Sequence, residues 1–148
     1  MIPRGLERRV ELLLAQFPCL LLFGARQVGK STIVSKTKVA QGRKYLTFDD
    51  PETIAAARAD ADVFIDQAER LTIDEVQRYP DLFQRVKRSI DSERKAGRFL
   101  LTGSSAAEIL AAGKASALAG RSAILEMGPL TLAETEGRAP FDWLELLR

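Results

Sequence analysis

The segment 24–31 constrains the fold of this chain most, because its residue types and spacing match a phosphate-binding loop. It reads Gly-Ala-Arg-Gln-Val-Gly-Lys-Ser, the full pattern G-x-x-x-x-G-K-[ST]. Gly24 and Gly29 let the backbone turn tightly, so that successive N–H groups can point at one anion. We expect Lys30 to contact the β and γ phosphates of a nucleotide, and the Ser31 hydroxyl to ligate Mg²⁺.

Both flanks of this loop fit the same interpretation. The apolar run 19–23 has the length of a strand, and the segment 31–34 begins a helix whose N-terminus favours an anion. A chance glycine turn before a helix is the competing interpretation, and the flanks argue against it. We expect Arg26, inside the loop, to face solvent. The predicted nucleotide-binding residues are Gly24, Ala25, Arg26, Gln27, Val28, Gly29, Lys30, Ser31 and Thr32.

Composition narrows the class of protein. The 148 residues suit one domain over 1–148, and a net charge of +2 predicts no strong overall attraction to nucleic acid. No run of 18 apolar residues predicts a membrane span, and the N-terminus lacks a secretory signal, so we expect a cytoplasmic protein. The single cysteine, Cys19, excludes an intrachain disulfide, and we expect a buried thiol. The absence of histidine excludes histidine-based catalysis and most zinc sites.

Hydrophobic periodicity and turn residues predict alternating helices and strands. The expected helices are 6–17, 30–40, 52–59, a helix after Pro80 with apolar positions at 82, 83, 86 and 90, 106–112, and part of the tail through Trp143. The expected strands are 19–23, 44–48, 71–73, 98–102 and 123–127. This alternation predicts an α/β fold with a parallel sheet covered on both faces.

A second signal is the acidic pair at the end of the third expected strand. Asp74 can hold Mg²⁺ as the acidic partner of Ser31, and Glu75 can polarise the water that attacks a γ-phosphate. The interval between Ser31 and Asp74 leaves room for a helix, a strand and a helix. That interval predicts an extra strand between the two nucleotide-binding strands. An ordinary acidic turn is the alternative interpretation of the pair.

Two further candidates are weaker on residue types alone. Thr102, Ser104 or Ser105, at the end of the fourth expected strand, can hydrogen-bond the γ-phosphate or the attacking water, although a plain turn of small residues explains them equally well. Arg121 can stabilise a transferring phosphoryl group in its own or a neighbouring chain. A surface arginine is the alternative interpretation of Arg121.

The chain resembles a family of prokaryotic AAA-type ATPases in a series of motifs that runs nearly its whole length. The matching segments are 24–31, 48–52, 73–80, 99–105, 118–121 and 129–134. This resemblance implies a three-layer P-loop NTPase core of the additional-strand, catalytic-glutamate type, with strand order 5-1-4-3-2. It also implies ATP and Mg²⁺ as cofactors and strengthens Thr102, Ser104 and Arg121 as site residues.

The resemblance also carries an expectation about length. Family members continue into a C-terminal domain, so we expect this chain to be the ATPase core without that domain. We expect Lys30, Glu75, Ser104 and Arg121 to be catalytic, Thr102 to contact nucleotide, and Ser31 and Asp74 to hold the metal.

Three functions remain open on the sequence. The leading hypothesis is Mg²⁺-dependent ATP hydrolysis that drives a conformational change, with a homo-oligomer or another protein as partner. The second is a nucleotide-dependent binding module with negligible turnover. A small-molecule kinase is less consistent with the adjacent Asp74 and Glu75 and with the lack of an arginine-rich lid. Nucleic-acid binding has weak support from basic residues in the segment 85–95, which acidic residues interrupt.

Overall fold

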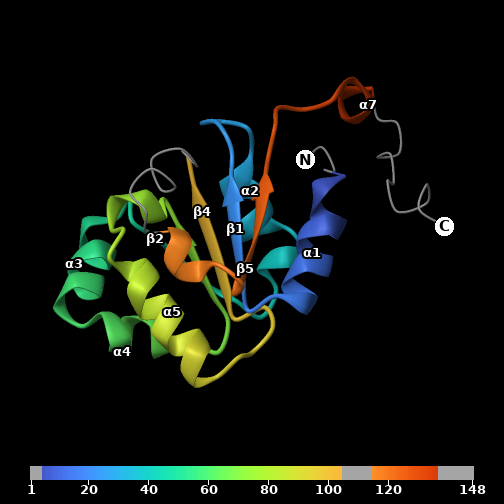
Figure 1. Cartoon of the computed structure of the whole chain (residues 1–148). Helices are drawn as coiled ribbons and strands as arrows, with labels where there is room; N and C mark the ends of the chain where they lie inside the picture. Colours follow the sequence, from blue (N-terminus) through green and yellow to red (C-terminus); the bar gives the residue numbers. More distant parts are fainter. Residues whose placement is uncertain (1–4, 105–114, 137–148) are drawn as a thin grey trace.

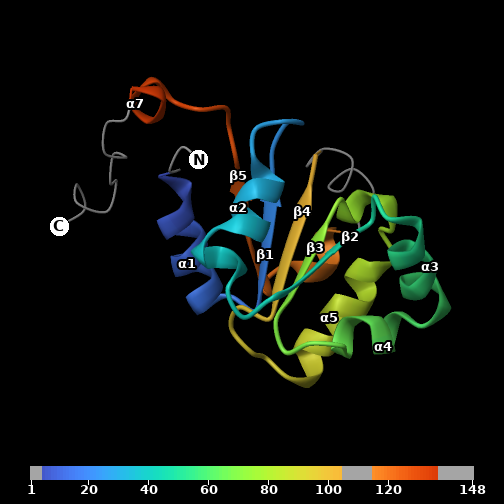
Figure 2. The same ribbon diagram turned by 180° about the vertical axis from the view of Figure 1, so that it is seen from behind.

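The computed structural model describes residues 5–104 and 115–136 as a three-layer α/β fold (Figures 1 and 2). The strands are β1 Cys19–Phe23, β2 Lys44–Thr47, β3 Leu71–Asp74, β4 Phe99–Gly103 and β5 Ser122–Glu126. The α-helices are α1 Leu6–Gln16, α2 Lys30–Lys36, α3 Pro51–Ala59, α4 Ala61–Asp66, α5 Leu82–Ser92 and α7 Leu132–Thr135. Short 3₁₀ turns are η1 Lys38–Ala40, η2 Val76–Arg78 and η3 Ala115–Leu118.

The five strands form one parallel sheet in the order β2-β3-β4-β1-β5. This order is the predicted 5-1-4-3-2 read from the other edge, so the predicted fold class is confirmed. β4 lies between β1 and β3, so an extra strand separates the two nucleotide-binding strands as predicted, whereas the strand within the interval between the two motifs, β2, lies at the edge of the sheet. Every residue of β1, β3 and β4 is buried, which explains why these strands are apolar runs without alternation.

Helices cover both faces of this sheet. Figure 1 shows α5 in front of the sheet, and Figure 2 shows α1 and α2 in front of the opposite face. One core cluster, on the α3–α5 side, includes Leu21, Phe83 and Leu101, while the other, on the α1–α2 side, includes Leu22 and Val34. Successive residues of β1 belong to the two clusters in turn, so this strand is packed on both faces. The phosphate loop therefore begins at the end of a firmly packed strand.

Two helices differ clearly from the sequence expectations. Helix α2 ends at Lys36 because the Thr37 hydroxyl donates to the Ile33 carbonyl and accepts from the Val39 N–H, which starts η1. Helix α4 was not predicted. The expected helix 106–112 and the tail beyond residue 136, including Trp143, lie outside the described residues.

A partly buried arginine ties the strands together at the end of the sheet where they begin. The Arg43 guanidinium donates to the Thr72 hydroxyl at 2.9 Å, to the Gly97 carbonyl at 2.5 Å and to the Leu71 carbonyl at 2.7 Å. Burial lowers the pKa of Arg43 to about 10, and the nearby charge of Arg70 acts in the same direction. This end of the sheet is therefore held by hydrogen bonds and lies opposite the end that carries the predicted phosphate loop.

Candidate nucleotide-binding site

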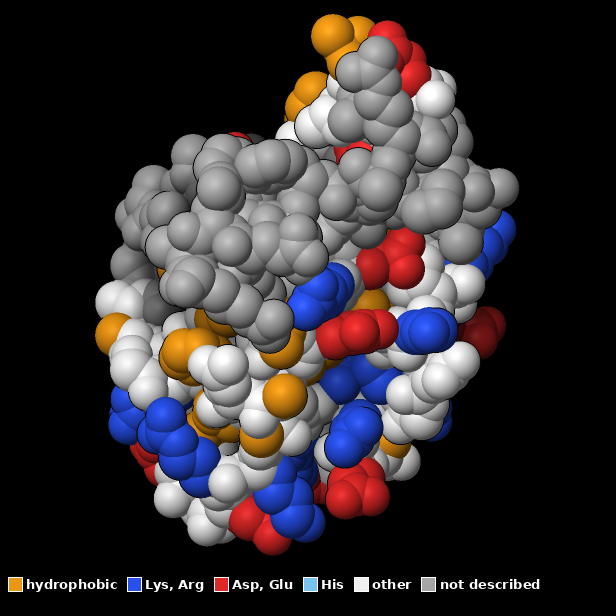
Figure 3. Space-filling view, turned by 90° about the vertical axis from the view of Figure 1, so that its right-hand side faces the viewer, with side chains coloured by type: hydrophobic (Ala, Val, Ile, Leu, Met, Phe, Trp, Pro, Cys, Tyr) orange, Lys and Arg blue, Asp and Glu red, His pale blue; other side chains and the backbone are white. Residues whose placement is uncertain are grey.

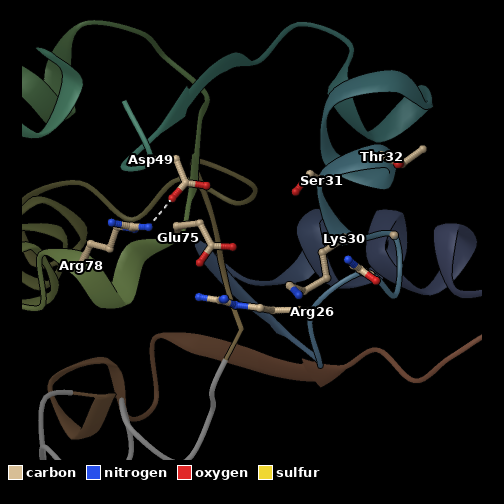
Figure 4. Close-up of a pocket in the computed structure, with 9 residues that line it drawn as sticks. Arg26, Lys30, Ser31, Thr32, Asp49, Glu75 and Arg78 are labelled. Atoms are coloured by element: carbon tan, nitrogen blue, oxygen red, sulfur yellow. Dashed lines mark ion pairs between the residues drawn. The ribbon is translucent and has the colours of Figure 1, made fainter. Parts of the chain in front are cut away.

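The predicted site residues converge at the edge of the sheet where the parallel strands end. The phosphate loop follows β1, Asp74 and Glu75 stand at the end of β3, and Ser104 follows β4. A cavity of about 490 Å³ opens here, between the phosphate loop and the turn after β3 (Figure 4). The residues that line it are Arg26, Gln27, Gly29, Lys30, Ser31, Thr32, Asp49, Glu75 and Arg78.

The phosphate loop presents a buried lysine to this cavity. Lys30 is 5% exposed, and its ammonium group donates to the carbonyls of Gly24 at 2.7 Å and Ala25 at 2.8 Å. Burial lowers the pKa of Lys30, while the negative charges of Glu75 and Asp74 oppose that effect. The loop thus holds a desolvated positive charge where an incoming phosphate group can replace two carbonyl acceptors.

Asp74 is the centre of a cluster of hydroxyl groups. It is 3% exposed, and its Oδ2 accepts from the Ser31 hydroxyl at 2.6 Å and the Tyr45 hydroxyl at 2.8 Å. The Thr102 hydroxyl donates to its Oδ1. Burial and the bond to Asp74 raise the pKa of Tyr45, so the phenol stays protonated and remains a donor. Ser31 and Asp74 are therefore in direct contact, as the sequence interpretation requires.

The donor set fits a magnesium ion. Mg²⁺ is held in such sites by one or two protein oxygens together with waters and substrate phosphates, rather than by a complete protein cage. The described residues supply a carboxylate at Asp74 and a hydroxyl at Ser31, and they contain no cluster of three acidic, cysteine or histidine ligands. Ser31 and Asp74 could therefore hold Mg²⁺ only together with a nucleotide.

Glu75 directly follows Asp74 and lines the cavity together with Ser31. Its backbone is left-handed, with φ of 57° and ψ of 40°, and its side chain reaches into the cavity. Figure 4 shows the Arg26 guanidinium on the cavity side, facing Glu75, so Arg26 is exposed as expected but also lines the site. The Gln77 side chain donates to Glu75 Oε2 and, at 3.0 Å, to Ser104 Oγ.

A second cavity of about 480 Å³ lies beside the first and shares Arg26, Gln27, Gly29 and Thr32 with it. Its other lining residues are Glu7, Val28, Ile33, Thr37, Pro129 and Leu130. Several of these side chains are apolar, in contrast to the charged lining of the first cavity. The two cavities together can receive a ligand with one highly charged part and one flat, less polar part.

Two of the remaining predicted residues have different outcomes. Thr102 belongs to the site because its hydroxyl donates a hydrogen bond to Asp74. Arg121 precedes β5, whose first residue pairs with Cys19 at the start of β1, about 16 Å along the strands from the phosphate loop. There Arg121 pairs with Asp91 on α5 at 2.5 Å. The structure therefore does not bring Arg121 to the site of its own chain, because a parallel neighbour of β1 places its N-terminal end opposite the loop.

Sequence reasoning missed four residues at this edge. Tyr45 and Gln77 contact Asp74 and Glu75, and Arg78 pairs with Asp49 at 2.7 Å on the rim of the cavity (Figure 4). Proximity in sequence to Glu75 could have indicated Gln77 and Arg78. Tyr45 could not be found in this way, because only the pairing of β2 with β3 brings it to Asp74.

Most basic side chains of the segment 85–95 interact with acidic or carbonyl groups of the same chain. Three of its cations form ion pairs with carboxylates: Arg85–Asp62, Lys87–Asp91 and Lys95–Glu93. Arg94 donates to the carbonyl of Gly120. On the side shown in Figure 3, acidic and basic side chains are interspersed over the described surface. These features are more typical of a solvated face than of a nucleic-acid interface.

Within residues 5–104 and 115–136, every helix is too short or too polar to cross a bilayer. The fold and the site together define an α/β protein of the P-loop NTPase class. The family described as AAA domain matches residues 16–136, and the chain belongs to that family. It is thus an AAA-type P-loop domain, as its motifs indicate.

Curated relatives share this domain but are longer. The chain is 33% identical over 138 residues to Uncharacterized protein Rv2008c of Mycobacterium tuberculosis and equally to Uncharacterized protein Mb2031c of Mycobacterium bovis. Each match covers 92% of this chain and 31% of the relative. The chain therefore spans about a third of the length of these relatives.

Solved structures agree on the fold. A Walker-type ATPase of Pyrococcus abyssi is similar over 90% of this chain and 55% of its own, with a TM-score of 0.62 and 14% identity. The P-loop NTPase domain of a sigma-54 transport activator from E. coli is similar over 84% of this chain and 92% of its own, with a TM-score of 0.53 and 19% identity. At these identities, the likeness concerns the fold.

Proposed function

We propose that this domain binds Mg²⁺-ATP and hydrolyses its terminal phosphoanhydride, in a cycle that drives a conformational change. The direct contact between Ser31 Oγ and Asp74 Oδ2, beside the buried ammonium of Lys30, carries this proposal. It supports a site in which Ser31 and Asp74 would hold the metal ion of a nucleotide whose phosphates lie beside Lys30. AAA-type membership and a Walker-type structural neighbour support the same class of activity.

The two cavities suggest how ATP would lie. The triphosphate would enter the charged cavity, where loop N–H groups and Lys30 face its β and γ phosphates. The base would occupy the neighbouring cavity, against apolar side chains such as Val28 and Leu130. Mg²⁺, when bound, would neutralise developing charge on the phosphates. Ser31 and Asp74 would hold this ion: the Ser31 hydroxyl would then no longer donate to Asp74, while Thr102 and Tyr45 would still donate to the Asp74 carboxylate.

The chemical step uses Glu75 as general base. A water oxygen bonds to the γ-phosphorus as its proton passes to the Glu75 carboxylate. The bond between that phosphorus and the bridging oxygen breaks, and ADP leaves with the electron pair. Lys30 stabilises the negative charge on the phosphates in this step, and the Ser104 hydroxyl can donate to a γ-phosphate oxygen.

Steady-state phosphate release from the purified chain tests this proposal. Lys30→Ala should abolish nucleotide binding, and Glu75→Gln should keep binding but lower kcat by about 10²–10⁴-fold. Lys36→Ala and Glu52→Gln, at exposed positions of α2 and α3, are matched controls that should behave like the wild type. Turnover by the wild type that is no faster than turnover by Glu75→Gln would contradict hydrolysis by this chain.

A nucleotide-dependent binding module without turnover gives a different result. It would show stabilisation by Mg²⁺-ATP that is unchanged in Glu75→Gln, together with no phosphate release by either protein. Binding to a partner protein or to further copies of this chain belongs to the proposal in both cases. Because Arg121 lies far from its own loop, we propose that any contribution it makes to hydrolysis occurs in the site of a neighbouring chain.

A further inference from the structure

The Gln77 side chain connects the ends of two strands at the mouth of the site. It belongs to η2, directly after Glu75, and its Nε2 donates both to Glu75 Oε2 and, at 3.0 Å, to Ser104 Oγ. Ser104 follows β4, so this one amide joins the turn after β3 to the end of the neighbouring strand. The catalytic step as written above uses Glu75 and Ser104 but assigns nothing to Gln77.

The chemistry of the three groups fixes the direction of these hydrogen bonds. A carboxylate can only accept, so the amide NH₂ must face Glu75, and its second hydrogen serves Ser104. The Ser104 oxygen therefore accepts, and its own O–H remains available to donate to an anion. Gln77 Oε1 is buried and has no hydrogen-bond partner among the described residues, so the amide is held by its two donated bonds alone.

The backbone around Gln77 keeps the amide in this place. Glu75 lies in the left-handed region, which is unfavourable for a residue with a side chain and is common at functional sites. After it, the Arg78 N–H bonds to the Glu75 carbonyl at 3.1 Å, and the Tyr79 N–H bonds to the Val76 carbonyl at 3.1 Å. Val76 is fully buried, so η2 is anchored on the core. The direction of the Glu75 carboxylate thus depends on a rigid turn and on Gln77.

We propose that Gln77 is a positioning residue that couples contact of Ser104 with the terminal phosphate to the orientation of the Glu75 carboxylate. This coupling rests on the proposed hydrolysis of ATP. When a γ-phosphate oxygen accepts the Ser104 hydrogen, the Ser104 oxygen becomes a better acceptor, and the bond from Gln77 strengthens. With ADP that phosphate oxygen is missing, so the same chain of bonds is weaker. The Glu75 carboxylate is therefore held more firmly in the orientation for attack when a terminal phosphate is present than when ADP is bound.

The first test replaces Gln77 by methionine, which has nearly the same shape but cannot donate. Gln77→Met should lower kcat about 10–100-fold, as is typical when a supporting hydrogen bond around a reacting group is lost. KM for ATP and the affinity for ADP should not change, because Gln77 does not touch the phosphate loop. Gln84→Met, on the exposed side of α5, is the matched control and should keep wild-type kinetics.

The second test is a double-mutant cycle with Ser104→Ala. If the two residues act as one unit, Gln77→Met combined with Ser104→Ala should be no slower than the slower single variant. Independent roles would multiply the two losses. Gln77→Leu, which also removes both donors and adds no charge beside Glu75, replaces Gln77→Met in the cycle if that variant melts below the assay temperature. A purely structural role would raise KM or lower stability without producing this non-additivity.

The outcomes separate the coupling from the hydrolysis on which it rests. A wild-type chain that binds Mg²⁺-ATP but releases no phosphate would defeat both. Normal kcat in Gln77→Met, or multiplied losses in the double variant, would defeat the coupling and leave the hydrolysis standing. A loss of kcat at unchanged KM, together with a non-additive cycle, supports the coupling.

Discussion

Asp74 shows at the scale of a single residue how the proposed metal site is organised. Three hydroxyl groups, from Ser31, Tyr45 and Thr102, donate to its two carboxylate oxygens. Under the proposed function, only the Ser31 hydroxyl would have to leave Asp74 when a metal binds. The other two would then hold the carboxylate in the same orientation, so Tyr45 supports the metal site without touching it.

Removing that support should weaken the use of magnesium. Tyr45→Phe loses the phenol oxygen but keeps the ring, and we expect the Mg²⁺ concentration for half-maximal turnover to rise about tenfold. A magnesium titration of phosphate release measures this. Tyr79→Phe is the matched control, because Tyr79 contacts Phe48 through its ring. An unchanged magnesium requirement in Tyr45→Phe would show that the hydrogen bond from Tyr45 is not needed to orient Asp74.

Cys19 gives a prediction about pH. The thiol is fully buried in β1, and burial raises its pKa above the ordinary value. The folded state therefore keeps the proton, whereas the unfolded thiol ionises near about pH 8.5. Stability from this group is complete below that pH and is lost as the pH rises above it. A thiol reagent at pH 8 should react with Cys19 only after denaturant is added, and rapid reaction of the native chain would contradict this.

The site residues could be predicted from the sequence where one segment contains the whole signal. Lys30 and Ser31 sit in a contiguous pattern, and Asp74 and Glu75 follow a short apolar run. Tyr45 could not be predicted, because its role depends on strand pairing between distant segments. The position of Arg121 relative to its own site also follows from strand direction, which residue types alone do not contain.

At the scale of an element, the start of the phosphate loop packs closely against the end of β5. A Cβ atom at Gly24 would lie 2.2 Å from the carbonyl oxygen of Met127, whose own N–H bonds to the Phe23 carbonyl at 2.6 Å. Only glycine permits this approach. The strand that carries the loop and the edge strand are therefore fixed together at the site.

Gly24→Ala should consequently weaken both folding and nucleotide binding, because either the loop or β5 must move. We expect a lower melting temperature and a loss of stabilisation by Mg²⁺-ATP, measured together in a thermal unfolding series. Gly128→Ala, in the segment that follows β5, is the control. A Cβ atom there meets nothing within 4 Å. Wild-type binding by Gly24→Ala would show that the loop tolerates the displacement.

Elements with a strong local signal were predicted well. The buried runs of β1 and β4 and the spaced apolar positions of α5 left little choice of structure. Helix α4 was missed because it is only six residues long, although Asp60 accepts bonds from its first N–H groups and could have indicated its start. The C-terminal end of α2 was misplaced because a side-chain bond from Thr37, rather than a glycine, ends it.

At the scale of the whole molecule, the candidate nucleotide site and the hydrogen bonds that stabilise the sheet lie at opposite ends of the strands. The ends of the strands carry the phosphate loop and Asp74, as is general for ligand sites of parallel α/β sheets. The beginnings of strands β3 and β4 are joined by hydrogen bonds from the partly buried guanidinium of Arg43. Changes at the two ends should therefore have different consequences for stability and for nucleotide binding.

Arg43→Met tests this separation. It leaves the carbonyls of Leu71 and Gly97 without their donor, and we expect a loss of about 3 kcal/mol in the free energy of unfolding. Arg43→Lys should recover only part of it, since an ammonium group cannot reproduce the planar fork. Nucleotide affinity of the folded fraction should stay unchanged, with Lys44→Met as the exposed control. Denaturant titrations and ATP binding at low temperature measure the two quantities, and a change in affinity would show that the ends communicate.

The left-handed backbone at Glu75 implies a compromise built into this domain. Glycine adopts that geometry without penalty, so Glu75→Gly should unfold at a higher temperature than the natural chain while releasing no phosphate. The more stable variant would then be inactive. Selection for catalytic activity rather than for stability would explain why an acidic side chain occupies this position.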